Sequence, residues 1–293
     1  MQITEPGRII DNVYMIANPF MPIYLLKGTK LNIIIDSGVS ALGSIYLENI
    51  KTYLGSSNVK TYNLFTHSHY DHIGSAPYLK KHIPNLKTGG YYLIEQVLKS
   101  ENAVNLITSL NKDMETMLGV SFEDMSFKPF SLDIKLNGGE VFDTGNDTLE
   151  AIYTPGHTRD SMCYYLRGSK IMFTGEEAGV LEPTGKILPE FLTSYKLYIQ
   201  SLNKLKQYSV DYIAVAHGGV IAREQARHFF DDSLKETHNF IGRIKRYYNE
   251  YKSIDAVVER IHKEDYISSG ISQPERAYFI NLQAKVKAVV ENK

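Results

Sequence analysis

Three of the chain's nine histidines lie within six positions of the stretch FTHSHYDHIG, at residues 65–74. His67 and His69 stand at i and i+2 in a loop that leaves a predicted strand, so their rings can point the same way. Asp71 and His72 begin the helix that follows and face a second point nearby. Imidazole and carboxylate are ligands of transition metals, and this spacing can serve two ions.

Two more histidines share a local context, a tight turn with glycine directly after an apolar strand. They are His157 in TPGHT and His217 in AHGG. Glycine at such a turn allows the backbone to approach a metal centre closely. Two acids, Glu176 and Glu177, follow the strand KIMF in FTGEE. This set, which uses no cysteine, indicates a site for zinc, iron or manganese.

Each of the other four histidines stands alone in the sequence. An isolated histidine is more often a surface or helix-capping residue than a ligand. We therefore interpret these four as structural: His82, His228, His238 and His262. The clustered histidines differ, because gathering several ionisable groups without a use for them wastes solvation energy.

The elements that position these residues begin with short β-branched and aromatic runs bounded by turn residues, which are typical of strands. RIIDNVYMIA, PIYLLKG and KLNIIIDSG predict a small sheet. A helix is expected from Ser40 to Leu54, and VKTYNLFT then predicts a buried strand that leads into the histidine cluster. The cluster therefore lies on a strand-to-helix loop. A mostly helical insertion is predicted at 91–118.

The strands SLDIKL, TLEAIYT, MCYYLR and KIMFTG predict a second sheet after that insertion. Ser194 is placed to cap the helix YKLYIQSLNKLKQY, and VDYIAVAHGG is a further strand. From Arg223 onward nearly everything is helical, with a break near 268–270 and a Pro274 suited to a first helical turn. We expect one domain at 1–222 and a C-terminal helical extension at 223–293 packed on it.

Composition describes an ordinary globular protein, with 43% hydrophobic and 22% charged residues. Lysine and arginine number 32 against 33 acids, so the basic excess of a nucleic-acid binder is absent and no such partner is expected. No run approaches the length of a membrane span. The start, MQITEPGRIIDN, lacks signal-peptide features, so we expect a cytoplasmic protein with no membrane partner. Cys163, in the apolar run SMCYYL, is interpreted as a buried packing thiol.

These motifs carry a resemblance. HSHYDH resembles the HxHxDH signature of the metallo-β-lactamase fold superfamily, and PGHT, FTGE and AHGG are similar to its later ligand motifs in the expected order. The likeness covers about residues 8–220. It implies an α/β fold, the four-layer αββα sandwich, in which two sheets pack face to face with helices outside. The metal site would lie along one edge.

Carried over by position, the resemblance implies two divalent transition-metal ions, with zinc first and iron or manganese as alternatives. The implied ligands fall into one triad, a second triad and one bridging acid: His67, His69 and His157; Asp71, His72 and His217; and Glu176. The family usually has aspartate at the bridging position. Glu177 fits less well, because the family's acid directly follows the TG pair. Asp36, in IIIDSG, resembles an aspartate that orients the ligand loop without binding metal.

The resemblance implies a hydrolase in which a water shared by two cations is ionised and attacks a carbonyl, with Asp71 relaying the proton to the leaving group. Within the superfamily the chain is similar to the thioesterase and effector proteins of quinolone signalling. HSHYDHIG, PYLKKHIPNL, SENAVNLITSLN and AHGG with its helical tail carry that likeness. It favours a small-molecule thioester or ester substrate of acyl-CoA type. The helices at 91–118 and after Arg223 would then narrow the entrance.

Other readings stay open. A glyoxalase-II-like or lactone hydrolase uses the same ligands, and a metal-stabilised signalling protein with little turnover belongs to another class. A β-lactamase proper is disfavoured because no export signal is expected, and a nuclease is disfavoured by the charge balance. A flavodiiron protein is disfavoured because His69 stands where such proteins have glutamate. A homodimer is compatible with the sequence. We interpret a further set of aromatic and methionine residues as packing residues: Tyr91, Tyr92, Tyr195, Tyr198, Met114 and Met117.

Overall fold

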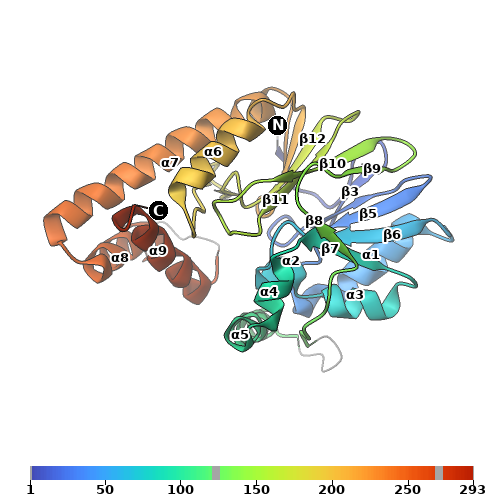
Figure 1. Ribbon diagram of the computed structural model, residues 1–293, viewed down its shortest axis with the longest axis horizontal. Helices are drawn as coiled ribbons and strands as arrows, with labels where there is room; N and C mark the ends of the chain where they lie inside the picture. The colour runs from blue at the N-terminus through green and yellow to red at the C-terminus, as the bar shows by residue number, and fades with distance from the viewer. Residues whose placement is uncertain (1, 121–125, 268–272, 293) are drawn as a thin grey trace.

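The structure is a computed structural model that describes residues 2–120, 126–267 and 273–292. Within these ranges the strands form two sheets of seven strands each and one separate hairpin. Figure 1 shows the two sheets stacked in the middle of the molecule, with helices on both outer sides. The hairpin consists of β13 (Val180–Leu181) and β14 (Ile187–Leu188).

The first sheet is antiparallel from β2 to β5 and parallel from β5 to β8. In spatial order its strands are β2 (Gly7–Ile10), β3 (Val13–Ile16), β4 (Ile23–Leu26), β5 (Leu31–Ile35), β6 (Lys60–Leu64), β7 (Lys87–Tyr91) and β8 (Ile134–Leu136). The predicted small N-terminal sheet is thus the antiparallel half of a larger one.

The second sheet is antiparallel except for the parallel pair β12 and β15. In spatial order its strands are β1 (Gln2–Ile3), β16 (Val220–Ala222), β15 (Tyr212–Val215), β12 (Ile171–Gly175), β11 (Met162–Leu166), β10 (Thr148–Tyr153) and β9 (Val141–Asp143). Because β10 and β12 both pair antiparallel with β11, the strands β10, β12 and β15 run in one direction. Their carboxyl ends therefore meet at one edge.

Parallel neighbours need long crossover connections, and helices supply them. The connecting helices are α1 (Gly43–Leu54) after a 3₁₀ turn (Ser40–Leu42), α2 (Tyr70–Ile73), α3 (Ala76–His82), α4 (Ile94–Lys99), α5 (Glu101–Leu118) and α6 (Tyr195–Leu205). The prediction that Ser194 caps α6 is confirmed, since its hydroxyl accepts a hydrogen bond from the Leu197 N–H.

The predicted helical insertion at 91–118 was wrong in its start and in its continuity. Tyr91 ends strand β7, and the helical part is divided at Ser100, which has an extended conformation. The Ser100 hydroxyl accepts a hydrogen bond from the Ala103 N–H and caps α5. This segment is the crossover from β7 to β8, so the parallel sheet itself requires it.

Strand β7 was missed because its sequence, KTGGY, contains two adjacent glycines, which weaken strand propensity. Both glycines are closely packed against neighbouring side chains. A Cβ atom on Gly89 would lie 2.8 Å from Leu64 Cδ2, and one on Gly90 would lie 2.6 Å from Ile94 Cδ1. The segment SLDIKL was consequently assigned to the wrong sheet, since β8 pairs with β7 in the first sheet.

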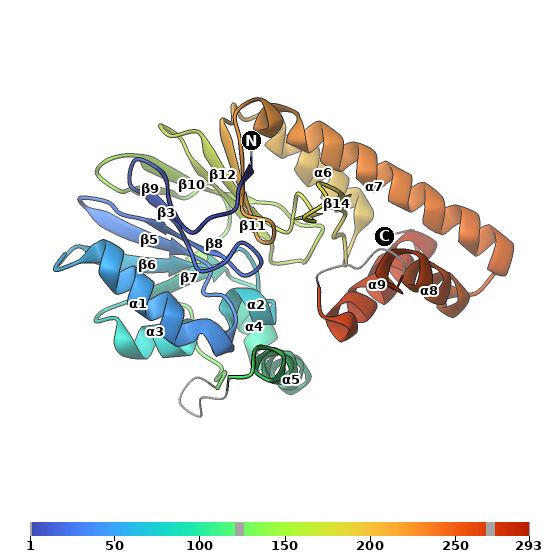
Figure 2. The ribbon, with the colours of Figure 1, turned by 180° about the vertical axis from the view of Figure 1, so that it is seen from behind.

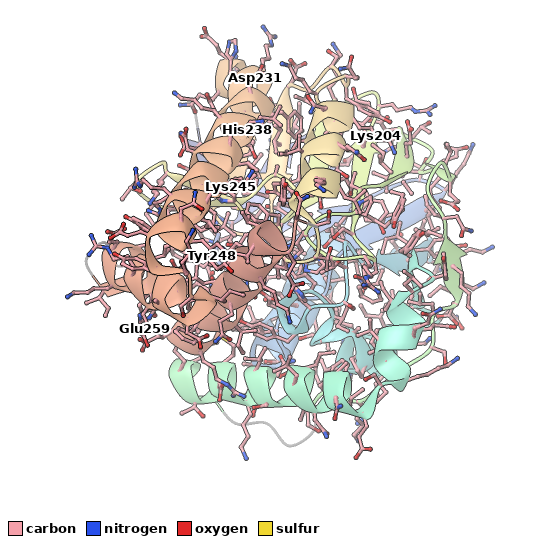
Figure 3. The ribbon with its side chains drawn as sticks, turned by 60° about the vertical axis from the view of Figure 1, so that its left-hand side comes forward. Lys204, Asp231, His238, Lys245, Tyr248 and Glu259 are labelled. Carbon is pink, nitrogen blue, oxygen red and sulfur yellow. The ribbon has the colours of Figure 1, made fainter. Side chains whose placement is uncertain are left out.

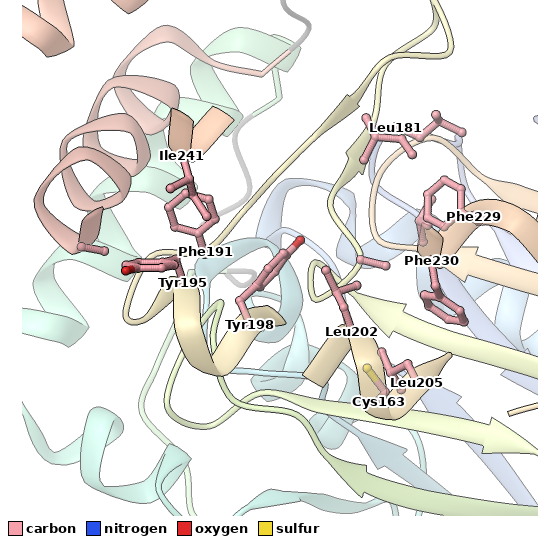
Figure 4. Close-up of a cluster of buried hydrophobic side chains, with 14 of the residues drawn as sticks. Cys163, Leu181, Phe191, Tyr195, Tyr198, Leu202, Leu205, Phe229, Phe230 and Ile241 are labelled. Carbon is pink, nitrogen blue, oxygen red and sulfur yellow. The ribbon is translucent and has the colours of Figure 1, made fainter. Parts of the chain in front are cut away.

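Three hydrophobic clusters separate four layers, which confirms the αββα sandwich (Figures 1 and 2). The cluster between the sheets includes Ile33 and Phe173. A second cluster, with Tyr46, fills the space between the first sheet and α1, α3, α4 and α5. The third fills the space between the second sheet and the later helices (Figure 4).

Strand β11 shows how the sequence determines these layers. Its side chains alternate between the two faces of the sheet. Tyr164 and Leu166 point into the cluster between the sheets, whereas Cys163 and Tyr165 point into the outer cluster. Cys163 is a buried free thiol, as predicted.

The C-terminal part is helical, as predicted from Arg223. It comprises α7 (Glu224–Tyr251), α8 (Ile254–His262), a π-helical turn (Lys263–Ile267) and α9 (Glu275–Val290). Asp231, His238 and Lys245 lie along the exposed face of α7 (Figure 3). None of the helices in the described ranges has the length and apolar character needed to cross a membrane.

The α9 helix starts after Pro274, which occupies its N-cap position. The predicted break near 268–270 lies outside the described residues. The division into 1–222 and 223–293 stays a prediction, although the later helices share the outer hydrophobic cluster with β11, β12 and β15.

The two sheets are joined by a buried hydrogen bond next to the histidine loop. The Tyr164 hydroxyl, on β11, donates to the carbonyl of Phe65 at 2.7 Å. Phe65 directly precedes Thr66 and His67, so this bond fixes the start of the histidine loop against the opposite sheet.

We predict that Tyr164→Phe lowers the free energy of unfolding by about 1–3 kcal/mol, because the buried Phe65 carbonyl loses its donor. Urea denaturation of the metal-free protein measures this. Tyr62→Phe, at a half-buried position of β6, is the control and should change stability by less than about 0.5 kcal/mol. Equal effects of both substitutions would contradict the assignment.

Candidate metal centre

The sandwich edge collects the seven side chains that the sequence singled out as ligands. His67 follows β6 of the first sheet, and the cluster continues into α2, for which His69 is the N-cap residue. His157, Glu176 and His217 follow β10, β12 and β15, whose carboxyl ends share one edge of the second sheet. Parallel strand direction therefore brings together residues as far apart in the chain as 67 and 217.

The first group of side chains converges on one point. His157 Nε2 lies 3.1 Å from His67 Nε2, 3.1 Å from His69 Nδ1 and 2.8 Å from Glu176 Oε2. Glu176 Oε2 is also 3.3 Å from His67 Nε2 and 3.6 Å from His69 Nδ1. Ligand atoms bound about 2.0–2.1 Å from one tetrahedral ion are separated by roughly 3.3 Å. These spacings therefore suit a transition-metal ion.

The second group consists of Asp71, His72 and His217. His217 Nε2 lies 3.3 Å from Asp71 Oδ2. Glu176 stands between the groups: its Oε2 is 3.8 Å from His72 Nε2, and its Oε1 is 3.7 Å from His217 Nε2. Glu176 occupies the position where the family usually has the shorter aspartate, and its carboxylate lies close to both groups.

Two of the imidazoles are held by main-chain carbonyl groups on the side away from the centre. His157 Nδ1 donates to the carbonyl of Glu190, and His217 Nδ1 donates to that of Phe20, each at 2.5 Å. Such bonds fix the tautomer, so that Nε2 carries a lone pair directed at the centre.

Asp36 and Thr66 hold two other histidines. Asp36 Oδ2 accepts from His72 Nδ1 at 2.8 Å, and both Asp36 oxygens lie within 3.0 Å of the Thr66 hydroxyl. Because the hydroxyl proton goes to Asp36, the Thr66 oxygen is left to accept from His67 Nδ1 at 3.1 Å. Asp36 thus lies where the resemblance placed it, behind the histidines. Its φ of 61° is unusual for a residue other than glycine and indicates local strain.

This arrangement fits a bound cation. Within the first group, the inward ring nitrogens face each other and a carboxylate, and they cannot all donate to one another. In the second group, His72 Nε2 is buried and has no hydrogen-bond partner within the described structure. A buried polar atom without a partner costs free energy, and a metal ion would satisfy it.

The pKa shifts of two residues of the first group also suit metal ligands. Burial, together with His72 and His69, lowers the pKa of His67 well below its usual value, so its ring is neutral. Burial alone would raise the pKa of the Glu176 carboxyl, but His157, His67 and His69 hold it well below the usual range. Neutral imidazole and ionised carboxylate are the forms that bind metal.

Comparison with known proteins identifies the family. The model of the metallo-beta-lactamase superfamily matches residues 22–217. This chain belongs to the metallo-β-lactamase superfamily. Most of its members are hydrolases, and the superfamily binds divalent metals.

Two curated relatives and one solved structure are similar to this chain. The metallo-beta-lactamase fold-containing protein ST1585 of Sulfurisphaera tokodaii is 30% identical over 209 residues, which cover 68% of this chain and 73% of that protein. The atrochrysone carboxyl ACP thioesterase of Aspergillus fumigatus is 26% identical over 70% of this chain and 52% of its own length. The chain therefore spans about half of that thioesterase. The structure of a beta-lactamase domain protein from Burkholderia ambifaria has a TM-score of 0.69 at 16% identity, covering 99% of this chain and 88% of that one.

The remaining candidates lie outside the two groups. Glu177 is buried beside them, where its Oε2 accepts from the His157 N–H at 3.2 Å. The four isolated histidines belong to none of the possible ligand groups in the described ranges: His82, His228, His238 and His262. His262, for example, stacks on Tyr266 and pairs with Glu275 at 3.1 Å.

The structure adds supporting residues that the sequence did not reveal. The carbonyl groups of Phe20 and Glu190 leave no signature in the sequence, because every residue has one. Tyr198, interpreted as a packing residue, is fully buried, and its hydroxyl donates to the carbonyl of Glu176 at 3.4 Å. Among these supporting residues, Thr66 could have been predicted from the sequence, because it is adjacent to His67.

We predict that Asp36→Asn weakens zinc binding by about 10–100-fold, because His72 and Thr66 lose the carboxylate that holds them. Competition with a chelator measures the affinity. Asp143→Asn, which removes an exposed carboxylate paired with Lys30, should leave zinc affinity unchanged. An Asp36→Asn protein with the affinity of the wild type would refute this role.

A pH dependence follows for the metal-free protein. Burial opposes protonation of His217, but its hydrogen bond to Asp71 outweighs this and raises the pKa of His217 to about 9. The unfolded value is about 6.5. This stabilisation is therefore fully present below pH 6.5 and is lost as the pH rises through about 9.

We accordingly expect the free energy of unfolding of the metal-free protein to fall between these two pH values. His72, whose pKa is also raised because Asp36 outweighs the effect of burial, adds to the fall. Urea titrations at several pH values measure it. His217→Gln should reduce the slope, and an unchanged slope would exclude His217 as its source.

Proposed function

We propose that this protein is a dinuclear metal-dependent hydrolase of a thioester or ester, with an acyl-CoA-type thioester as the favoured substrate. The observation that carries the proposal is the position of Glu176. Its Oε2 lies 2.8 Å from His157 Nε2 in one ligand group, while its Oε1 faces His217 of the other. One buried carboxylate thus serves both groups, as a bridge between two ions requires.

The assigned ligands of one ion are His67, His69 and His157, and those of the other are Asp71, His72 and His217, with Glu176 shared. Two divalent ions, of zinc, iron or manganese, would lower the pKa of a water to near neutrality and polarise a carbonyl oxygen. The chain's own residues orient these groups through the hydrogen bonds to Asp36, Phe20 and Glu190.

Asp71 is the residue that we assign to proton transfer. Its carboxylate lines a small pocket at the second ligand group and is held by His217. The hydrogen bond from His217 keeps the pKa of Asp71 below its usual value although burial opposes this. An ionised Asp71 can take the proton of the attacking water and deliver it to the leaving sulfur or oxygen. Water then adds across the acyl bond, giving an acid and a thiol or alcohol.

The pocket beside Asp71 is small. It has a volume of about 30 Å³ and is lined by Asp71 and His217 together with mostly apolar residues: Phe20, Met21, Tyr70, Val180, Gln273 and Pro274. Gln273 and Pro274 directly precede α9, which supports a role for the C-terminal part of the chain beside this pocket. The α5 helix does not line the pocket, but its Asn111 side chain donates a hydrogen bond to the carbonyl of Tyr70, a lining residue, at 3.4 Å.

Similarity to a thioesterase supports the choice of a thioester. The relative named atrochrysone carboxyl ACP thioesterase matches over 70% of this chain. A thiolate also needs little protonation to leave, which suits a centre with a single assigned acid, Asp71.

We predict that zinc-loaded protein hydrolyses short acyl-CoA thioesters and aryl esters, and that His69→Ala lowers kcat/KM at least about a hundredfold. His69 contributes Nδ1 to the first ligand group, and its side chain is 31% exposed. His82→Ala, on the remote helix α3, is the matched control and should retain activity. Release of thiol from the thioesters and of phenol from the aryl esters measures turnover.

The same panel includes a hydroxyacyl-glutathione thioester and a simple lactone. Preference for either by more than about tenfold in kcat/KM would move the assignment to that substrate class. Equal inactivity of the wild type and His69→Ala over the whole panel, with metal bound, would overturn the enzyme proposal and favour a metal-stabilised binding protein.

A further inference from the structure

A buried ion pair lies on the side of His157 away from the ligand groups. Lys285 of α9 and Glu190, which follows β14, approach to 2.7 Å between Nζ and Oε1. Their side chains are 3% and 1% exposed. The ammonium group also lies 5.6 Å from the ring centre of Phe240 and 5.8 Å from that of Tyr278.

Helix α9 does not need this charge in order to pack. Its other buried side chains are apolar or aromatic, and Leu282 and Val286 belong to the outer hydrophobic cluster. A buried ion pair is often no more stabilising than an apolar pair of similar volume, because both charges must be removed from water. The presence of Lys285 there calls for a role that an apolar side chain could not fill.

That role concerns the segment 189–194, which we call the strap. Lys285 Nζ donates to the carbonyl of Pro189 at 3.2 Å as well as to the Glu190 carboxylate. The strap in turn holds the loop that carries the third ligand of the first group. The Glu190 carbonyl accepts from His157 Nδ1, and the Leu192 N–H donates to the His157 carbonyl at 3.2 Å.

Further contacts with neighbouring residues restrict the position of the strap. The Glu190 N–H donates to the Tyr198 hydroxyl at 3.4 Å. Phe191 contacts Tyr198 and Tyr195 with ring centres 6.0 and 6.3 Å apart (Figure 4). On its other side, Gly156 packs so tightly on α6 that a Cβ atom there would lie 2.3 Å from Tyr198 Cα. The position of the Glu190 carbonyl is therefore set by the groups that hold Glu190.

We propose that Lys285 is a positioning residue for His157. It holds the Glu190 side chain and the Pro189 carbonyl, and these hold the strap so that the Glu190 carbonyl fixes His157 with Nε2 toward the first ligand group. The proposal rests on the proposed metal site. If it holds, helix α9 supports the metal site from behind His157, through Lys285.

The test is metal affinity. Lys285→Met keeps most of the buried side chain but removes the ammonium group, and we expect it to weaken zinc binding about tenfold, at the low end of the range for residues that orient a ligand. The cobalt-substituted protein should show a changed visible absorption spectrum, because His157 is one of its ligands. Lys287→Met, at an exposed position two residues away on the same helix, is the matched control and should change neither.

The double variant Glu190→Gln/Lys285→Met separates positioning from stability, since it leaves no unpaired buried charge. We expect it to unfold at a urea concentration closer to that of the wild type than Lys285→Met does, yet to bind zinc as weakly. It also carries the test should Lys285→Met fail to fold. Wild-type zinc affinity and cobalt spectrum in the double variant would overturn the role of Lys285. Failure of the wild type itself to bind zinc would instead overturn the proposed function.

Discussion

The convergence of imidazole lone pairs on a buried carboxylate is the constraint on which the rest of this structure depends. His67, His157 and Glu176 are each almost completely buried, and their inward atoms cannot satisfy one another by hydrogen bonding. Such a cluster persists only if each ring is held from outside. The hydrogen bonds to Asp36, Thr66, Phe20 and Glu190 provide that support.

The sandwich architecture explains why the cluster can form at one place. Strands β10, β12 and β15 run in the same direction in the second sheet, and β5 and β6 are parallel in the first. Loops at their carboxyl ends therefore meet along a common edge. The Met162 N–H donates to the Thr66 carbonyl at 2.7 Å and ties the two sheets together beside this edge. The superfamily fold thus supplies the framework, and its loops supply the chemistry.

Helix α9 of the C-terminal part approaches the candidate metal centre at two places. Pro274, at the start of α9, lines the pocket beside Asp71, whereas Lys285, further along the same helix, reaches the strap behind His157. The same helix therefore reaches both the pocket beside Asp71 and the strap behind His157. The α9 helix packs into the outer cluster through apolar residues such as Leu282 and Val286.

The sequence by itself determined the ligand types, the strand-end context of each histidine and the alternation that produces two sheets. These are local properties: period-two patterns, turn residues, and clusters such as HSHYDH are visible in short windows. The same local reasoning failed at β7, where two glycines conceal a strand, and at Ser100, where an apparently continuous helix ends and another begins. Only the tertiary structure decided which groups hold the ligands. A carbonyl such as that of Glu190, or a lysine 128 positions after His157, becomes a partner through chain crossing and burial, and neither is recorded in the neighbouring residues.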